Sequence, residues 1–214
     1  MKMSKKGNIS ASVIKRLPRY YRFLGELKAQ GVQRITSREL AKKMKTTASQ
    51  VRQDFNCFGG FGQQGFGYNV SLLYEEIKQI LGLNNTYKTI LIGAGNLGRA
   101  VAMHMSFEER GFELVGIFDR DSTLKGQIIR GISVESDEDL ETFCQNNHIK
   151  VAILCIPRNS VGETAKRLYR SGVKCYWNFS HYDLYADYDD IVVQNVHMSD
   201  SLMILCYKIS DVNQ

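Results

Sequence analysis

Apolar residues recur at helical spacing through the first third of the chain. Ser10 is expected to cap a first helix that Pro18 breaks or restarts, after which the apolar spacing resumes. Thr36 or Ser37 can cap the next helix, and a further helix is expected over residues 48–57. Two short helices joined by a tight break predict a helix-turn-helix.

A stretch rich in glycine and aromatic residues follows these helices. Five of the nine residues 59–67 are glycine, and two phenylalanines are interleaved with them. Glycine permits tight turns and aromatic residues suit short strands, so the stretch predicts a hairpin with Gln63–Gln64 at its tip. A hairpin after a helix-turn-helix is the wing of a winged helix, and a flexible linker is the alternative. A helix capped by Ser71 is expected over residues 71–81.

Short apolar strands alternate with helices in the rest of the chain. This alternation predicts an α/β domain with a doubly wound parallel sheet of the Rossmann type. The expected strands are residues 89–92, 113–118, 131–134, 151–156, 173–177 and 191–196, and the expected helices are 97–110, 137–147, a helix capped by Asn159 or Ser160 that ends at Arg170, and 199–209. We therefore expect three parts: a winged domain over residues 1–84, a nucleotide-binding domain over 85–198, and a C-terminal helix over 199–214.

Charge separates the two ends of the chain. Residues 1–58 carry 14 Lys+Arg and 3 Asp+Glu, a net charge of +11, whereas residues 59–214 carry 14 Lys+Arg and 19 Asp+Glu, a net charge of −5. A basic head on an acidic body suggests different partners for the two parts. Nucleic acid is the first candidate for the head.

Composition excludes several classes of protein. The longest apolar runs, Val151–Ile156 and Leu202–Tyr207, are far shorter than the ~20 residues that span a bilayer. The basic start of the chain lacks the apolar stretch of a signal peptide, so a cytoplasmic protein without membrane contact is expected. Five cysteines without a C-x-x-C pair argue against a disulfide framework or a zinc ribbon, and the four histidines have no metal-binding spacing.

A glycine-rich loop carries the strongest chemical signal. Gly93, Gly95 and Gly98 form a G-x-G-x-x-G fingerprint between a strand and a helix, and Asp119 ends the next strand. The loop and helix N-terminus suit a pyrophosphate, and the Asp119 carboxylate suits the hydroxyls of the adenine ribose. NAD(H) is favoured over NADP(H), although Arg120 can accommodate a phosphate. Another nucleotide, or coenzyme A, is the alternative ligand.

Little in the sequence indicates hydride-transfer catalysis. Tyr74-x-x-x-Lys78 has the spacing of a short-chain dehydrogenase pair, but it precedes the fingerprint, whereas it follows the fingerprint in those enzymes. We interpret the spacing as a coincidence. No catalytic residue is assigned.

The second helix of the helix-turn-helix has a hydrogen-bonding outer face. Ser49, Gln50, Arg52, Gln53 and Asn56 point outward by periodicity, and such side chains read base edges or bind phosphates. A solvated face of a small helical bundle is the alternative.

Together these features resemble the Rex family of redox-sensing transcriptional repressors along nearly the whole chain. The matching segments are Lys15-Arg16-Leu17-Pro18, Tyr20-Tyr21-Arg22, Val51-Arg52, Asp54-Phe55, Phe58-Gly59 to Gly67-Tyr68, Gly93 to Gly98, Phe118-Asp119, Val151 to Leu154, and Asn178-Phe179. No single segment is specific, but their combination is.

The resemblance implies a homodimer that binds a palindromic operator in double-stranded DNA. It implies that NADH closes the dimer and misaligns the recognition helices, that NAD⁺ permits DNA binding, and that the C-terminal helix crosses to the partner subunit. The cofactor-binding residues expected from the fingerprint and the resemblance are Gly93, Ala94, Gly95, Asn96, Leu97, Gly98, Arg99, His104, Asp119, Arg120, Ile156, Pro157, Asn178, Phe179 and Ser180. The expected DNA-binding residues are Lys15, Arg16, Arg19, Ser49, Gln50, Arg52, Gln53, Gly62, Gln63 and Gln64.

The chain departs from the family pattern at several expected functional positions. Gln53 and the wing tip are neutral where relatives are often basic, and each lost cation removes a phosphate contact. His104 stands where the family has an aromatic residue near the nicotinamide. His197 replaces an Asp that pairs with an arginine matching Arg16 in an interdomain switch, and His181 replaces a proline. We expect either a rewired, pH-dependent switch or neutral substitutions at tolerant positions.

Three functions remain at this point. The first is an NADH-responsive repressor, and the second is an NAD(H)-binding relative that has lost DNA binding and acts through a protein partner. The third is an NAD-dependent oxidoreductase, which the residues favour least.

Overall fold

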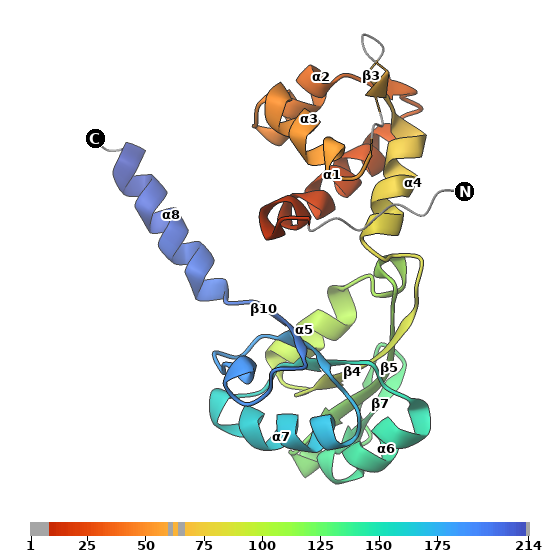
Figure 1. Cartoon of the computed structure of the whole chain (residues 1–214). Coiled ribbons are helices and arrows are strands. Elements are labelled where there is room, and N and C mark those ends of the chain that lie inside the picture. The colour runs from red at the N-terminus through yellow and green to blue at the C-terminus, as the bar shows by residue number, and fades with distance from the viewer. Residues whose placement is uncertain (1–8, 60–61, 64–66, 213–214) are drawn as a thin grey trace. The chain divides into compact units, whose positions relative to one another are not determined.

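The computed structural model describes residues 9–59, 62–63 and 67–212 of the 214-residue chain. The chain divides into two compact units, residues 1–84 and residues 85–214 (Figure 1). Each unit has its own buried core and is described by itself.

The first unit is a winged helix. Its described elements are α1 (Ala11–Ala29), β1 (Arg34–Ile35), α2 (Ser37–Met44), α3 (Ala48–Asn56), β2 (Gly62–Gln63), β3 (Gly67–Asn69) and α4 (Val70–Ile80). The three strands form an antiparallel sheet in the order β1-β3-β2, in which Gly62 is opposite Tyr68 and Gln63 is opposite Gly67. The predicted hairpin is therefore present directly after α3. Of the two residues predicted at its tip, Gln63 lies in strand β2 instead, and Gln64 lies outside the described residues.

The predicted break at Pro18 is wrong. Helix α1 runs without interruption through Pro18, which lies in the middle of its 19 residues. A proline removes one hydrogen bond from a helix, but Leu17, Tyr20 and Leu24 are fully buried in one stripe that extends across it. The free energy gained by burying this stripe outweighs the lost hydrogen bond.

Side-chain caps fix where the helices of this unit begin. Thr36 caps α2, accepting from the backbone of Glu39 while the Glu39 carboxylate accepts from the backbone of Thr36. Of the two predicted caps, Thr36 is thus the cap and Ser37 is the first helical residue. Asn69, not the predicted Ser71, caps α4.

The second unit is a Rossmann-type α/β domain. Its described elements are β4 (Tyr87–Ile92), α5 (Asn96–His104), η1 (Glu108–Arg110), β5 (Phe112–Asp119), η2 (Ser122–Leu124), β6 (Ile128–Ile129), β7 (Ile132–Ser136), η3 (Asp137–Asp139), α6 (Leu140–Asn147), β8 (Val151–Leu154), α7 (Arg158–Arg170), β9 (Cys175–Asn178), η4 (Leu184–Ala186), β10 (Val192–Asn195) and α8 (Met198–Val212). The sheet order is β10-β9-β8-β4-β5-β7-β6, and all its neighbouring pairs are parallel except β6 with β7. The order reverses between β4 and β8, where such sheets bind their ligands.

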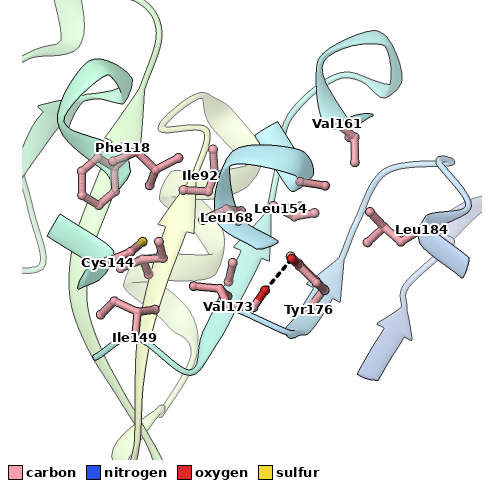
Figure 2. Packing of buried hydrophobic residues seen from close by; sticks show 14 of the residues in the cluster. Ile92, Phe118, Cys144, Ile149, Leu154, Val161, Leu168, Val173, Tyr176 and Leu184 are labelled. Carbon is pink, nitrogen blue, oxygen red and sulfur yellow. Dashed lines mark hydrogen bonds between the residues drawn. The ribbon is translucent and has the colours of Figure 1, made fainter. Parts of the chain in front are cut away.

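Both faces of this sheet are buried. Along β4, Ile90 and Ile92 pack with residues of α6 and α7, whereas Leu91 packs on the opposite face with residues of α5. Figure 2 shows the first face, where Leu154, Val161 and Leu168 lie together and the buried Tyr176 hydroxyl donates to the carbonyl of Val173 at 2.7 Å. Burial on both faces accounts for the continuous apolar runs of these strands.

Some element bounds differ from the sequence expectation. The helix predicted over 97–110 ends at His104, and the chain then turns so that Phe107 enters the core. Strand β6 is absent from the prediction. Helix α7 begins at Arg158 without a side-chain cap, so neither Asn159 nor Ser160 caps it.

Helix α8 is exposed along its described length. Apolar side chains from Leu202 to Tyr207, including Ile204, remain in contact with solvent. In Figure 1 the helix extends as a single rod from the strand that precedes it. Among the described residues, no helix combines the length and the apolar character needed to cross a membrane.

Candidate functional site

Three glycines shape the loop between β4 and α5, each for a different reason. Gly93 has φ +99°, and a Cβ there would lie 2.5 Å from the carbonyl oxygen of Cys155. A Cβ on Gly98 would lie 1.8 Å from the carbonyl oxygen of Gly93, so the helix packs on the loop only because Gly98 has no side chain. Gly95 has an ordinary extended backbone, and a Cβ there would meet nothing within 4 Å. The open space at Gly95 is therefore available to a ligand.

The Asp119 carboxylate is held beside this loop at the end of β5. Its Oδ2 accepts from the backbone N–H of Ala94 at 2.5 Å, and its Oδ1 accepts from the backbone N–H of Asp121 at 2.8 Å. Each carboxylate oxygen can accept a further hydrogen bond. The carboxylate is thus fixed in orientation and still able to accept from ribose hydroxyls.

A cavity of about 450 Å³ lies at these strand ends. Six of the predicted cofactor-binding residues line it: Gly93, Gly95, Asp119, Arg120, Ile156 and Pro157. The structure brings the glycine loop, the β5 acid and the loop after β8 to one place. An adenosine diphosphate moiety fits this arrangement, because its phosphates would face the N-terminus of α5 and its ribose would face Asp119.

Several other predicted cofactor residues lie elsewhere. Asn96, Leu97 and Arg99 lie in the first turn of α5, and the Arg99 guanidinium donates to the side chain of Gln127. His104 is exposed at the far end of the same helix, about 12 Å along its axis from the loop at 1.5 Å per residue. The cavity lining of this chain does not include His104.

The predicted residues after β9 form a tight polar turn. The buried Asn178 donates to the carbonyl of Tyr182 at 2.9 Å and to the side chain of Asn195 at 2.8 Å. Its oxygen accepts from the backbone and the hydroxyl of Ser180, and Phe179 packs on Trp177 with ring centroids 4.7 Å apart. These contacts set the course of the loop at the strand end.

Sequence reasoning missed part of the cavity wall. Ile92, Asp121, Asp137, Cys155, Ser160 and Thr164 also line the cavity. Asp121 and Asp137 could have been predicted from the sequence, because each follows the carboxyl end of a strand, where such sheets bind ligands. Burial raises the pKa of the Cys155 thiol to about 12, which favours the protonated, less reactive form at neutral pH.

In the first unit, a buried carboxylate connects α1 to α3. Asp54 is fully buried, and its two oxygens accept from the Arg16 guanidinium at 2.7 Å each. Tyr20 donates to the same carboxylate at 2.9 Å and Gln50 donates at 2.8 Å. Burial alone would raise the pKa of Asp54, but the hydrogen bonds from Arg16, Gln50 and Tyr20 hold it below its ordinary value.

This arrangement gives Arg16 and Gln50 a structural role that the sequence did not reveal. Both were expected to contact DNA directly, and both side chains, themselves partly exposed, donate to the buried Asp54 carboxylate. Asp54 orients α3 against α1 through these hydrogen bonds.

The remaining predicted DNA-binding residues of the two helices are exposed. Lys15 and Arg19 lie on α1, while Ser49, Arg52 and Gln53 lie on α3. Arg52 also donates to the hydroxyl of Ser37 at 3.2 Å, which places it between α2 and α3. Their exposed faces can meet the phosphates and base edges of a duplex.

Arg16 and His197 belong to different units, and each has partners within its own. The His197 ring stacks on His181 with centroids 4.8 Å apart, and its Nδ1 lies 3.6 Å from the carboxylate of Asp200. Its Nε2 is buried without a hydrogen-bond partner among the described residues. The predicted Arg16–His197 switch stays a prediction.

The dehydrogenase-like pair lies in the winged unit. The Tyr74 hydroxyl donates to that of Tyr21 at 2.6 Å, and their rings stack at 4.5 Å. This tyrosine therefore packs α4 on α1. The described residues hold no group of three or more His, Cys, Asp or Glu side chains that could bind a metal ion.

Family models match both units. A model described as "Putative DNA-binding protein N-terminus" matches residues 8–56, and one described as "CoA binding domain" matches residues 84–182. The second model agrees with a nucleotide-binding domain, and each model covers less than half of the chain.

Relatives match the chain over nearly its whole length. The redox-sensing transcriptional repressor Rex of Thermoanaerobacter pseudethanolicus is 54% identical over 209 residues, covering 98% of this chain and 93% of the relative. Rex of Clostridium kluyveri is 48% identical over 210 residues, covering 98% of this chain and all of the relative. The crystal structure of RSP with β-NAD⁺ and operator DNA has a TM-score of 0.89 and 52% identity, covering 96% of this chain and 94% of that one. On this evidence the chain belongs to the Rex family of redox-sensing transcriptional repressors.

Proposed function

We propose that this protein is a homodimeric repressor that binds palindromic operator DNA and releases it when NADH binds. The observation that carries the proposal is the joining of a winged helix to a Rossmann cavity in a chain about half identical to RSP. RSP itself has been solved with β-NAD⁺ and operator DNA, and with β-NADH at a TM-score of 0.88. Binding to chromosomal DNA places the protein in the cytoplasm.

The winged unit supplies the DNA-binding surface. Its exposed cations on α1 neutralise phosphates, and the outer face of α3 meets base edges in the major groove. Gln50 is held by Asp54, whereas Ser49, Arg52 and Gln53 are exposed on α3 and can meet bases. Gln53 suits adenine.

The second unit supplies the sensor. The pyrophosphate binds at Gly95 and the N-terminus of α5, and the adenine ribose binds at Asp119. The protein itself carries out no chemical step on the nicotinamide. NADH acts by binding the DNA-incompetent arrangement of the dimer more tightly than the competent one, since a ligand shifts an equilibrium only by its differential affinity.

Helix α8 supplies the dimer contact. Its central residues from Leu202 to Tyr207 are all apolar and exposed, so the helix is hydrophobic around its whole circumference. A helix of this kind requires burial on every side, which a partner subunit can provide. We propose that α8 inserts between the two subunits.

A gel-shift titration tests the proposed function. We expect the protein to retard an AT-rich palindromic duplex, NADH to release it, and NAD⁺ to leave it bound. A matched variant, Gly95→Val, should bind the duplex and resist release by NADH. No shift at low salt would favour an NAD(H)-binding protein that acts through a protein partner. Turnover of NADH with a panel of carbonyl compounds would favour an oxidoreductase.

Substitution within α8 tests the dimer. Leu205→Asp places a charge on a surface that must be buried, and losing the burial of one leucine is worth roughly 2 kcal/mol. We expect the dimer dissociation constant to rise at least about tenfold, measured by analytical ultracentrifugation. Lys208→Gln, which changes the net charge equally at an already polar position of the helix, should leave it unchanged. Equal dimerisation of both variants would contradict a dimer contact at α8.

A further inference from the structure

Arg120 directly follows the last residue of β5 and lines the cavity. Its Nε lies 3.4 Å from Oδ2 of Asp137, and its Nη2 lies 3.4 Å from Oε2 of Glu163. Arg120 and Asp137 both line the cavity, and Glu163 precedes Thr164, another lining residue. The guanidinium therefore joins η3 to α7 beside the carboxylate expected to bind the adenine ribose.

The Asp137 carboxylate, one of the two partners of Arg120, is itself held by Arg167. Arg167 of α7 contacts Oδ2 of Asp137 at 3.3 Å and forms a two-pronged pair with Glu141. Asp137 is mostly buried, with 17% of its side chain exposed. Asp137 is thus held in place by Arg167, whereas the Glu163 side chain is 70% exposed.

The wall around the ribose position is strongly acidic. Asp119, Asp121 and Asp137 line the cavity, and Glu163 adds a fourth carboxylate at its edge. Arg120 is the cation that lines this wall, and its donors already face two of these carboxylates. An arginine next to the ribose acid ordinarily accommodates the 2′-phosphate of NADP(H). Here that arginine already contacts Asp137 and Glu163.

We propose that Asp137 and Glu163 make Arg120 a specificity residue, by holding it where it cannot receive a 2′-phosphate. The site then accepts a dinucleotide whose adenine ribose is unphosphorylated and rejects one that carries the phosphate. To bind the phosphate, Arg120 must leave both partners while a dianion enters a wall of carboxylates. This inference rests on the proposed function, because it assumes that the cavity binds a nicotinamide dinucleotide.

Binding titrations of NADH and NADPH to the full-length protein test the proposal. Wild type should bind NADH at least about tenfold more tightly than NADPH. Glu163→Gln releases one restraint on Arg120 and removes one charge, and we expect it to tighten NADPH about fivefold while changing NADH less than twofold. The matched control is Glu113→Gln, which removes the same charge at the opposite end of β5. It should change neither affinity.

A double variant separates the role of Arg120 from general electrostatics. Arg120→Ala combined with Glu163→Gln should lose most of the gain in NADPH affinity, because no guanidinium is left to receive the phosphate. Retention of the whole gain would overturn the proposal, as would an unchanged NADPH-to-NADH ratio in Glu163→Gln. Wild type that binds both dinucleotides equally would also overturn it. Wild type that binds neither would instead contradict the proposed function.

Discussion

Replacing Asp54 by alanine is expected to lower the free energy of unfolding of the winged unit by about 3 kcal/mol, because it leaves a partly buried guanidinium and a buried tyrosine hydroxyl without their acceptor. Arg16 is 32% exposed and recovers some hydration, so the loss falls at the lower end of the range for broken buried pairs. The Tyr20 hydroxyl is fully buried and recovers none. Operator binding should weaken in parallel, since α3 loses its anchor on α1.

Two spectroscopic signals distinguish the unfolding of the winged unit from that of the second unit. The chain has a single tryptophan, Trp177 in β9, so its fluorescence reports the second unit alone. Circular dichroism at 222 nm reports the helices of both units. We expect Asp54→Ala to move only the circular dichroism transition. Gln53→Ala, at an exposed position of α3, should change stability by less than about 0.5 kcal/mol.

Arg16→Ala distinguishes the structural role of this arginine from a simple phosphate contact. If Arg16 only contacted DNA, the variant would bind DNA more weakly and unfold as wild type does. We expect it to unfold more easily, because Asp54 is then a buried carboxylate without its ion pair. Unchanged stability of Arg16→Ala would show that the ion pair with Asp54 does not stabilise the winged unit.

The same carboxylate predicts a pH dependence. The pKa of Asp54 is lower in the folded protein than its ordinary value, so its contribution is present above the unfolded-state pKa of about 3.9. The contribution is lost as the pH falls through the folded-state pKa. Wild type should therefore lose more stability than Asp54→Asn on acidification from about pH 5 to pH 2. Parallel losses in the two proteins would show that other groups dominate acid unfolding.

Gly95→Val is expected to abolish most dinucleotide binding without unfolding the protein. The backbone at Gly95 is extended and a Cβ there meets no atom within 4 Å, so a larger side chain fits the folded chain. It fills the space through which the pyrophosphate approaches the loop. Losing two charge-assisted hydrogen bonds at roughly 1.5 kcal/mol each corresponds to an affinity about 100-fold weaker.

Thermal shift followed at Trp177 checks both parts of this expectation. NADH should raise the melting temperature of wild type and leave that of Gly95→Val unchanged, while the two proteins melt alike without ligand. Ala100→Val, exposed on the same helix outside the cavity lining, should respond to NADH as wild type does. Normal NADH binding by Gly95→Val would contradict the binding of the pyrophosphate at this loop.

Gly98 provides the contrasting case within the same fingerprint. A Cβ at Gly98 would overlap the carbonyl oxygen of Gly93, so substitution there displaces α5 from the loop. The fingerprint thus combines a residue that the ligand requires with one that the fold requires. The sequence shows the spacing of the glycines, and only the tertiary structure shows which glycine serves which purpose.

Local rules predicted most elements and failed where packing overrode them. Helix and strand periodicity located the winged unit and the alternating sheet, because each element must bury one face or one stripe. Pro18 is the clearest failure, since the buried stripe through Leu17, Tyr20 and Leu24 continues the helix past it. The end of α5 is another failure: the helix ends at His104 and not at the predicted residue 110, because the chain turns there to bury Phe107.

The sequence by itself determined the family pattern of this protein: a basic head, an acidic body, and a glycine loop followed by an acid. These depend on residue type and spacing along the chain, which local chemistry constrains. The tertiary structure decided that Arg16 and Gln50 bind Asp54, and that Arg120 faces Asp137 and Glu163. Arg16 and Asp54, and Arg120 and its two partners, lie far apart in the chain. Gln50 and Asp54 are neighbours on α3, but the same carboxylate also binds the distant Arg16. Only the packing of whole elements brings such groups together, so a cation that the sequence presents as free can be engaged by a buried or anchored carboxylate.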